Sequence, residues 1–287
     1  MDSGAIWSPT HQPTLEAKPG YEAIFSQARA EFRARVNEID SHLEITVSPE
    51  NDVEVRRITF TNHSDETRTI EVTTYAEIVL NTAAGGNCAS RLQQSIHPDA
   101  DRSPAERHHF VRADHAHRTK SCRASAILML VHGNEIGKAS LKPTVKNSSA
   151  VVATCHRPAA MQNSTPLSNS QGSVLDPVAA IRRTIRIEPK ETATITLVSG
   201  IAPTRRRDYR TNRKYQDQTI ADRCFELAWT HGSIVLRHLN TTEAEAQLFG
   251  RLAGALLYNQ SARRANPGVL VRNQRRPAQP LELRHFR

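Results

Sequence analysis

The sequence predicts a mainly β protein, with an antiparallel β-sandwich over residues 1–203 and a helical linker over 204–276. Three observations lead to this fold class. Apolar side chains alternate with polar ones from Tyr21 onward, short polar turns interrupt the alternation, and after Pro203 the apolar spacing changes from two residues to about 3.6. Of the 287 residues, 38% are hydrophobic, which is enough for a core of modest size.

The expected strands alternate and end at turn residues. The stretch 53–60 carries β-branched and aromatic residues, ends at the polar turn 62–66 and resumes as a strand over 68–80. We therefore expect an antiparallel hairpin. The remaining expected strands are 42–47, 180–187 and 192–201.

Two helices are expected in the linker. The apolar face of the first is Ile220, Cys224, Leu227, His231, Val235 and Leu239. The second is expected to begin at Thr242, because its side chain and that of Glu245 can form a capping box. Its apolar stripe is Leu248, Phe249, Leu252, Ala255 and Leu256. Asn266, Pro267 and Gly268 are expected to end it.

The net charge of +9 raises the possibility of a nucleic-acid partner. The basic residues are scattered, as at Arg56, Arg182 and 205–207, and aromatic residues make up only 5% of the chain, so neither a basic groove nor a base-stacking platform is indicated. A basic nucleic-acid-binding protein is therefore an alternative that the composition does not favour.

The chain is expected to be cytoplasmic. No apolar run is long enough to span a membrane, and residues 1–4 lack the basic and apolar regions of a secretion signal. Its four cysteines, at 88, 122, 155 and 224, are widely and irregularly spaced. Reduced thiols are the expected state, because this spacing is not that of a disulfide framework.

Several motifs resemble one carbohydrate-active family. Residues 6–13, Ile-Trp-Ser-Pro-Thr-His-Gln-Pro, and 25–32, Phe-Ser-Gln-Ala-Arg-Ala-Glu-Phe, are similar to the N-terminal sandwich (supersandwich) of glycoside hydrolase family 94, particularly in the phosphorylase-like part of cyclic β-1,2-glucan synthases. Further stretches with the same resemblance are 54–58, 61–62, 73–77, 172–177, 225–230 and 247–254.

The resemblance implies a fragment that carries the accessory, carbohydrate-binding-type domain. In the full-length family, a membrane-associated enzyme performs glucosyl transfer or phosphorolysis on β-1,2-glucans, and the general acid is an aspartate of an (α/α)6 barrel. That barrel would begin near Arg276, so we assign no catalytic residue to this chain and expect it to be inactive alone. A stand-alone sugar-binding module is the alternative.

Three stretches depart from the family: about 87–123, 141–158 and the tail 277–287. Residues 87–98 can be back-translated so that reading one nucleotide later gives Thr-Ala-His-Pro-Ala-Phe-Ser-Asn-Leu-Phe-Ile, which resembles a family segment. The tail, treated alike, gives Gln-Pro-Ser-Leu-Trp-Asn-Tyr-Gly-Ile-Ser-Gly, similar to the start of the family's catalytic domain. Residues 145–154 can likewise be back-translated so that a shifted frame gives Gly-Arg-Gly-Arg, a further family element. We hypothesise that these stretches are translated in a shifted frame. The sandwich is therefore expected to be incomplete, with low solubility or local disorder over about 87–123.

Sequencing the coding DNA tests the shifted-frame hypothesis. We expect the family segments in an alternative frame at the codons of 87–98 and 277–287. If the coding DNA holds one intact long reading frame, the shifts are sequencing errors. If the DNA lacks the family segments at those codons, the hypothesis is wrong.

Trp7 and Tyr21 are the candidate sugar-binding residues, because a pyranose face packs well on an aromatic plane. Core packing is the favoured role for both, since large aromatic side chains are usually mostly buried. By their strand and helix phases, Tyr75 and Trp229 are expected in the core.

No metal site or cofactor is expected. A cluster of potential zinc ligands lies at His97, His108, His109, His115, His117, Cys88 and Cys122. It lacks the closely spaced ligand pairs that structural zinc sites use. The carboxylates that could serve sugar chemistry are Asp99, Asp101, Glu106 and Asp114. They lie in the same departing stretch, and we expect solvated loop residues there.

Overall fold

The computed structural model describes residues 4–77, 93–94, 109–112, 124–144, 167, 172–173, 177–202, 213–258 and 265–272. The chain forms two compact units, 1–234 and 235–287. The predicted boundary at 203 and 204 lies outside the described residues.

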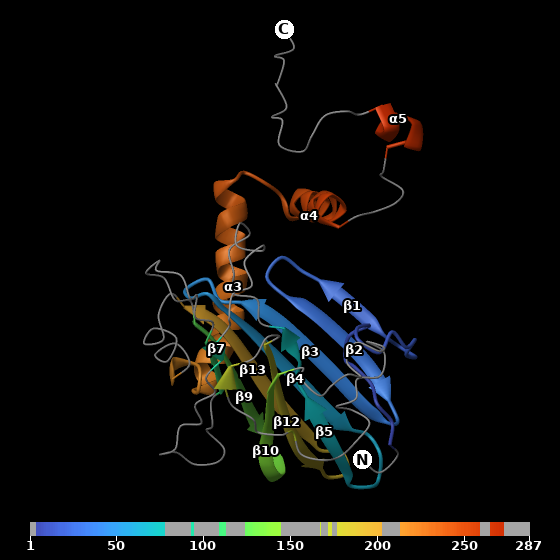
Figure 1. The fold of residues 1–287 in the computed structure, drawn as a ribbon, viewed down its shortest axis with the longest axis vertical. Helices are drawn as coiled ribbons and strands as arrows, with labels where there is room; N and C mark the ends of the chain where they lie inside the picture. The colour runs from blue at the N-terminus through green and yellow to red at the C-terminus, as the bar shows by residue number, and fades with distance from the viewer. Residues whose placement is uncertain are drawn as a thin grey trace. The chain divides into compact units, whose positions relative to one another are not determined.

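A seven-stranded antiparallel sheet is the main element of the first unit (Figure 1). In spatial order its strands are β1 (Glu22–Phe25), β2 (Ala30–Val36), β3 (Ile39–Val47), β4 (Val53–Asn62), β13 (Thr192–Ala202), β9 (Ala124–His132) and β8 (His109–Arg112). The predicted strands 42–47, 53–60 and 192–201 are confirmed as parts of β3, β4 and β13.

A smaller sheet packs against one face of the large sheet. Its strands are β10 (Asn134–Thr144), β12 (Pro177–Ile187) and β5 (Arg68–Thr73), with β6 (Ala76–Glu77) also paired to β12. β7 (Gln93–Gln94) and β11 (Gly172–Ser173) form a separate pair. The predicted strand 180–187 is part of β12, and 68–80 is described as β5 and β6 up to Glu77. The predicted hairpin of 53–60 with 68–80 is wrong, because the turn at 62–66 carries the chain from the large sheet to the small one, where β5 pairs with β12 instead of β4.

The core lies between the two sheets. The small sheet contributes Ile70, Ile181, Ile185 and Ile187, and the large sheet contributes Ile39, Phe60, Ile127, Met129, Ala193 and Ile195. Side chains of a strand alternate between its faces, so every second residue of the central strands enters this core. The predicted antiparallel β-sandwich is thereby confirmed.

Helix α3 (Gln218–His238) covers part of the opposite face of the large sheet. Its buried residues are Ala221, Cys224, Phe225 and Ala228, which pack with Val53, Val55, Leu128, Val198 and Tyr215. The predicted helix is confirmed, but its buried face is rotated from the predicted one. His231 is exposed because the sheet contact follows Phe225 and Ala228 rather than Leu227 and His231.

The second unit contains the end of α3, α4 (Glu243–Leu257) and α5 (Pro267–Arg272). The predicted capping box is confirmed: Thr242 accepts from the Glu245 amide, and the Glu245 side chain accepts from the Thr242 amide. The predicted end of this helix at 266–268 is wrong, because α4 ends at Leu257 and Pro267 instead begins α5. A proline suits a first helical position, where its missing N–H has no partner to lose.

Two further predictions need correction. Tyr75 and Trp229 are exposed, at 51% and 68%, rather than buried. Tyr75 lies in the break between β5 and β6, and Trp229 lies beside the buried face of α3 rather than on it. Of the departing stretches, only β7, β8 and the part of β10 from residue 141 are described, so the expected disorder over 87–123 falls largely outside the described residues.

Candidate functional site: a charged network beneath helix α3

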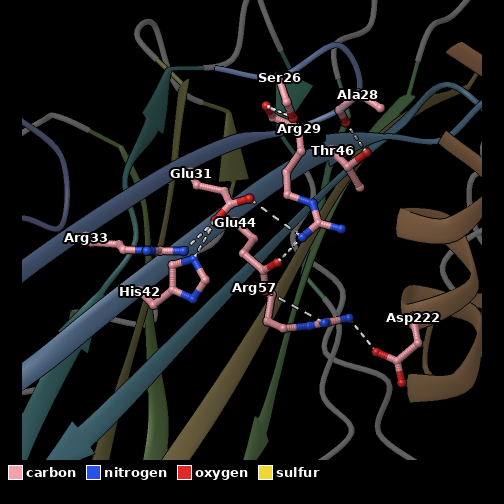
Figure 2. Close-up of polar contacts among 10 residues, drawn as sticks. All are labelled: Ser26, Ala28, Arg29, Glu31, Arg33, His42, Glu44, Thr46, Arg57 and Asp222. Atoms are coloured by element: carbon pink, nitrogen blue, oxygen red, sulfur yellow. Dashed lines mark hydrogen bonds and ion pairs between the residues drawn. The ribbon is translucent and has the colours of Figure 1, made fainter. Parts of the chain in front are cut away.

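The α3 face of the large sheet carries a cluster of charged side chains, here called the charged network (Figure 2). Its members are Arg29, Glu31, Arg33, His42, Glu44, Arg57 and Asp222. Strand register brings the sheet residues together, because Glu31 is paired with Glu44, Glu44 with Arg57, and Arg33 with His42. Direct cross-strand partners lie on the same face of a sheet.

Two neighbouring carboxylates form the centre of the network. The Glu44 side chain, 13% exposed, accepts from Arg29 at 2.7 Å and lies 3.8 Å from Arg57. Glu31 is 17% exposed and lies 3.3 Å from Arg33 and 3.0 Å from His42 Nε2. Like charges on direct cross-strand partners repel each other, and the surrounding cations offset this repulsion.

The turn before β2 positions Arg29. Ser26 donates to the Arg29 carbonyl oxygen at 3.1 Å, and Thr46 of β3 donates to the Ala28 carbonyl oxygen at 2.8 Å. These bonds hold the turn so that the Arg29 side chain extends between Glu31 and Glu44, as Figure 2 shows.

The same cations hold α3. Arg57 pairs with Asp222 in the first turns of the helix, and the guanidinium groups of Arg57 and Arg29 lie 4.5 and 5.2 Å from the Phe225 ring centroid. Contacts of this kind attract a cation to the ring face. Farther along, Gln27 donates to the Gly232 carbonyl oxygen at 2.8 Å. A Cβ at Gly232 would come within 3.3 Å of the Gln27 side chain, so a glycine permits this approach.

The electrostatics of Glu31 favour a fixed negative charge over proton transfer. Burial alone would raise its pKa, but the hydrogen bond from His42 and the charges of His42, Arg29 and Arg33 outweigh it and lower the pKa below the ordinary 4.5. A general acid for glycoside chemistry needs a raised pKa. The network is therefore suited to holding its arginine side chains and helix α3 in position.

The stability of the sandwich is expected to depend on the charge of Glu31. Because its folded-state pKa is depressed, its stabilising contribution is present above the unfolded-state pKa and is lost as the pH falls below about 4.5. Urea unfolding at pH 6 and pH 3.5 should show a smaller loss of stability on acidification for Glu31→Gln than for the unmodified chain. Equal losses in the two proteins would contradict this assignment.

The structure places the two candidate sugar-binding aromatics in different settings. Trp7 is half-buried and packs against the core between the sheets. Tyr21 is half-buried near the start of β1, with the Lys18 ammonium 5.4 Å from its ring centroid. The ring pair in contact among the described residues is Phe25 with Phe32, so Trp7 and Tyr21 are not brought together. Sugar stacking by either residue stays a prediction.

Most of the other candidates lie outside the described residues. This holds for the four carboxylates between 99 and 114, for three of the four cysteines and for the histidine side chains between 97 and 117. The fourth cysteine, Cys224, is a buried free thiol. Within the described part of the chain, no group of three potential metal ligands occurs.

The charged network was not predicted from the sequence. A signal was present, because charged residues occupy alternate positions at 29, 31 and 33 and again at 42 and 44. Alternation shows that such residues share a face of their own strand, but it does not show which strand pairs with which. The register between β2, β3 and β4 was the missing information.

Comparison with known proteins gives two sequence matches. The family model of the glycosyl hydrolase 94 supersandwich domain matches residues 1–218. The cyclic β-(1,2)-glucan synthase NdvB of Rhizobium meliloti (strain 1021) is 28% identical over 275 residues. This region is 92% of the chain but 9% of that protein, so the chain spans less than a tenth of the relative's length.

Solved structures also show similarity. A bacterial glucoamylase in complex with acarbose aligns over 74% of this chain and 28% of its own, with 8% identity and a TM-score of 0.43. A protein assigned as a kojibiose phosphorylase, from the human microbiome, aligns over 72% of this chain and 22% of its own, with 10% identity and a TM-score of 0.36.

Helix length and polarity bear on membrane association. Among the helices of the described ranges, none combines the length and apolar character needed to cross a bilayer.

Proposed function

The chain belongs to the glycosyl hydrolase 94 supersandwich family, and we propose that it is the accessory sandwich domain of a cyclic β-1,2-glucan synthase-like protein. The observation that carries the proposal is the match of the family model over residues 1–218, which covers the whole sandwich and the residues leading into α3. In this role the chain supports glucan chemistry carried out by another part of the full-length protein.

The chemistry of the charged network supports an accessory role. Its two central carboxylates are paired with arginines, and the lowered pKa of Glu31 keeps that group ionised. Arg29 and Arg57 contact Phe225, and Arg57 also pairs with Asp222. The network thus fixes helix α3 instead of presenting an acid and a base to a substrate.

The proposed partner is a β-glucan, and the proposed location is the cytoplasm. Many arginines of the described sandwich are paired with carboxylates, which leaves less free positive charge for phosphate groups than a nucleic-acid interface requires. The wide spacing of the cysteines agrees with a reducing compartment.

A domain exchange tests the proposal. The segment of the Rhizobium meliloti synthase that aligns with this chain is replaced by the chain, and cyclic glucan is measured in cells that lack their own synthase. We expect the exchanged protein to make cyclic β-1,2-glucan, whereas a synthase with the same segment deleted makes none. An exchanged protein that accumulates to the parental level without making glucan would refute the accessory role.

A further inference from the structure

A hollow of about 280 Å³ lies in the first unit, between the turn that follows β3 and the start of α3. It is separate from the charged network, and its rim carries Glu50, Lys214 and Arg223. We propose that this hollow binds one glucose residue of a β-glucan chain. The assignment of the sugar class rests on the proposed function.

The rim offers both acceptors and donors to sugar hydroxyl groups. The Glu50 carboxylate accepts from Lys214 Nζ at 2.9 Å and lies 3.9 Å from Arg223 Nη2. All three side chains are well exposed, at 46%, 39% and 62%, so each can turn toward a ligand. A hydroxyl group both donates and accepts, and neighbouring sugar hydroxyls can therefore bridge a carboxylate and an ammonium group.

One wall of the hollow is apolar. Ile220 and Leu227 lie two turns apart on the same side of α3, with Arg223 between them, and both are half-buried. The C–H face of a pyranose can pack against such a wall while its hydroxyl groups reach the rim. The rest of the lining is mostly polar, which suits a ligand rich in hydroxyl groups.

The polar hydroxyl groups at the floor of the hollow already have hydrogen-bond partners. The buried Tyr215 hydroxyl donates to Ser48 Oγ at 2.9 Å, and burial raises the pKa of the adjacent Cys224 thiol, which therefore stays neutral. The floor contributes shape and no free charge. A ligand must find its hydrogen bonds at the rim.

Size and charge select the ligand. Small-molecule sites commonly occupy roughly 300–1,000 Å³. This hollow is at the lower limit, which suits a single sugar residue with the rest of the chain outside. A phosphate ion would have to displace the Glu50 carboxylate from Lys214 and Arg223 to pair with these cations, whereas an uncharged sugar can bind with the rim pairs in place.

Titration of the full chain with the β-1,2-linked glucose disaccharide by calorimetry tests the proposal. We expect a dissociation constant on the order of 1 mM, and a loss of about tenfold in affinity for Glu50→Gln, because a charged acceptor is removed. The matched control is Asp65→Asn. It removes the carboxylate from another exposed lysine pair of the same length, Lys190 to Asp65 at 2.9 Å, and should leave affinity unchanged. Far-ultraviolet circular dichroism confirms that both variants fold.

Three results would overturn the assignment: no heat from the disaccharide, equal affinity in Glu50→Gln and the unmodified chain, or binding of inorganic phosphate in place of the sugar. The domain exchange reports separately on the proposed function. If the exchanged protein is active but the chain does not bind the disaccharide, only the assignment of the hollow is wrong. If the exchanged protein is inactive but the chain binds the disaccharide, only the accessory role is wrong.

Discussion

Replacing Glu135 by leucine is expected to lower the free energy of unfolding by about 3 kcal/mol or more, because it leaves a guanidinium group unpaired inside the sandwich. Arg183 lies on β12 between Ile181 and Ile185 and shares their core-facing side. Its side chain is 2% exposed, pairs through Nη1 with Glu135 of β10, and donates through Nη2 to the Met129 carbonyl oxygen at 3.4 Å.

Urea unfolding of matched variants separates this buried pair from an ordinary surface pair. Glu54→Leu removes the partner of Arg56, whose pair is 2.6 Å long but has side chains 45% and 33% exposed, and should cost less than about 1 kcal/mol. Adding Arg183→Met to Glu135→Leu should recover most of the loss, since a buried pair replaced as a unit leaves no isolated charge. Equal losses in Glu135→Leu and Glu54→Leu would show that Arg183 finds another partner.

Strands in which polar and apolar residues alternate could be predicted, whereas the continuously apolar strand β9 could not. β9 was missed because the run from Ala126 to Val131 is continuously apolar. The structure explains the run: Ile127 and Met129 enter the core between the sheets, while Leu128 packs with α3 on the opposite side. A strand buried on both faces has no alternation to detect.

The α3 face illustrates a second limit. Spacing alone predicted Ile220, Cys224, Leu227 and His231, and only Cys224 of these is among the buried residues. The true face is set by Phe225, whose ring contacts Arg29 from the turn before β2 and Arg57 from β4. Those contacts depend on strand register, which sequence periodicity does not contain. By contrast, the capping box at Thr242 is local and could be predicted.

Asn62 lies in a turn that could be predicted but makes contacts that could not. Its replacement by aspartate is expected to lower the free energy of unfolding by about 3 kcal/mol or more. The turn at 62–66 could be predicted, but not that Asn62 is fully buried and joins two turns. Its amide group donates to the carbonyl oxygens of Glu66 at 2.7 Å, Ile187 at 3.1 Å and Glu188 at 3.2 Å. A carboxylate in this place would put a buried negative charge against three acceptors.

Alanine at position 62 separates the donor and acceptor roles of the side chain. Its Oδ1 accepts from the Ser64 amide at 3.0 Å, a bond that aspartate keeps and alanine loses. Hydrogen exchange of the Ser64 amide should therefore be faster in Asn62→Ala than in Asn62→Asp, relative to the stability of each variant.

The free energies of unfolding of Asn62→Asp and Asn62→Ala test whether the bonds donated by the Asn62 amide contribute more to stability than the bond accepted by its Oδ1. We expect Asn62→Asp to be less stable than Asn62→Ala, because the alanine variant leaves carbonyl groups unpaired without adding a charge. Asn51→Ala is the control: it removes one bond of 3.3 Å to the Tyr215 hydroxyl from a half-buried side chain, and should cost about 1 kcal/mol or less. If Asn62→Asp were as stable as the unmodified chain, the two turns would be held together by other contacts, such as the backbone bond from Asn62 to Glu191 and the pair of Lys190 with Asp65.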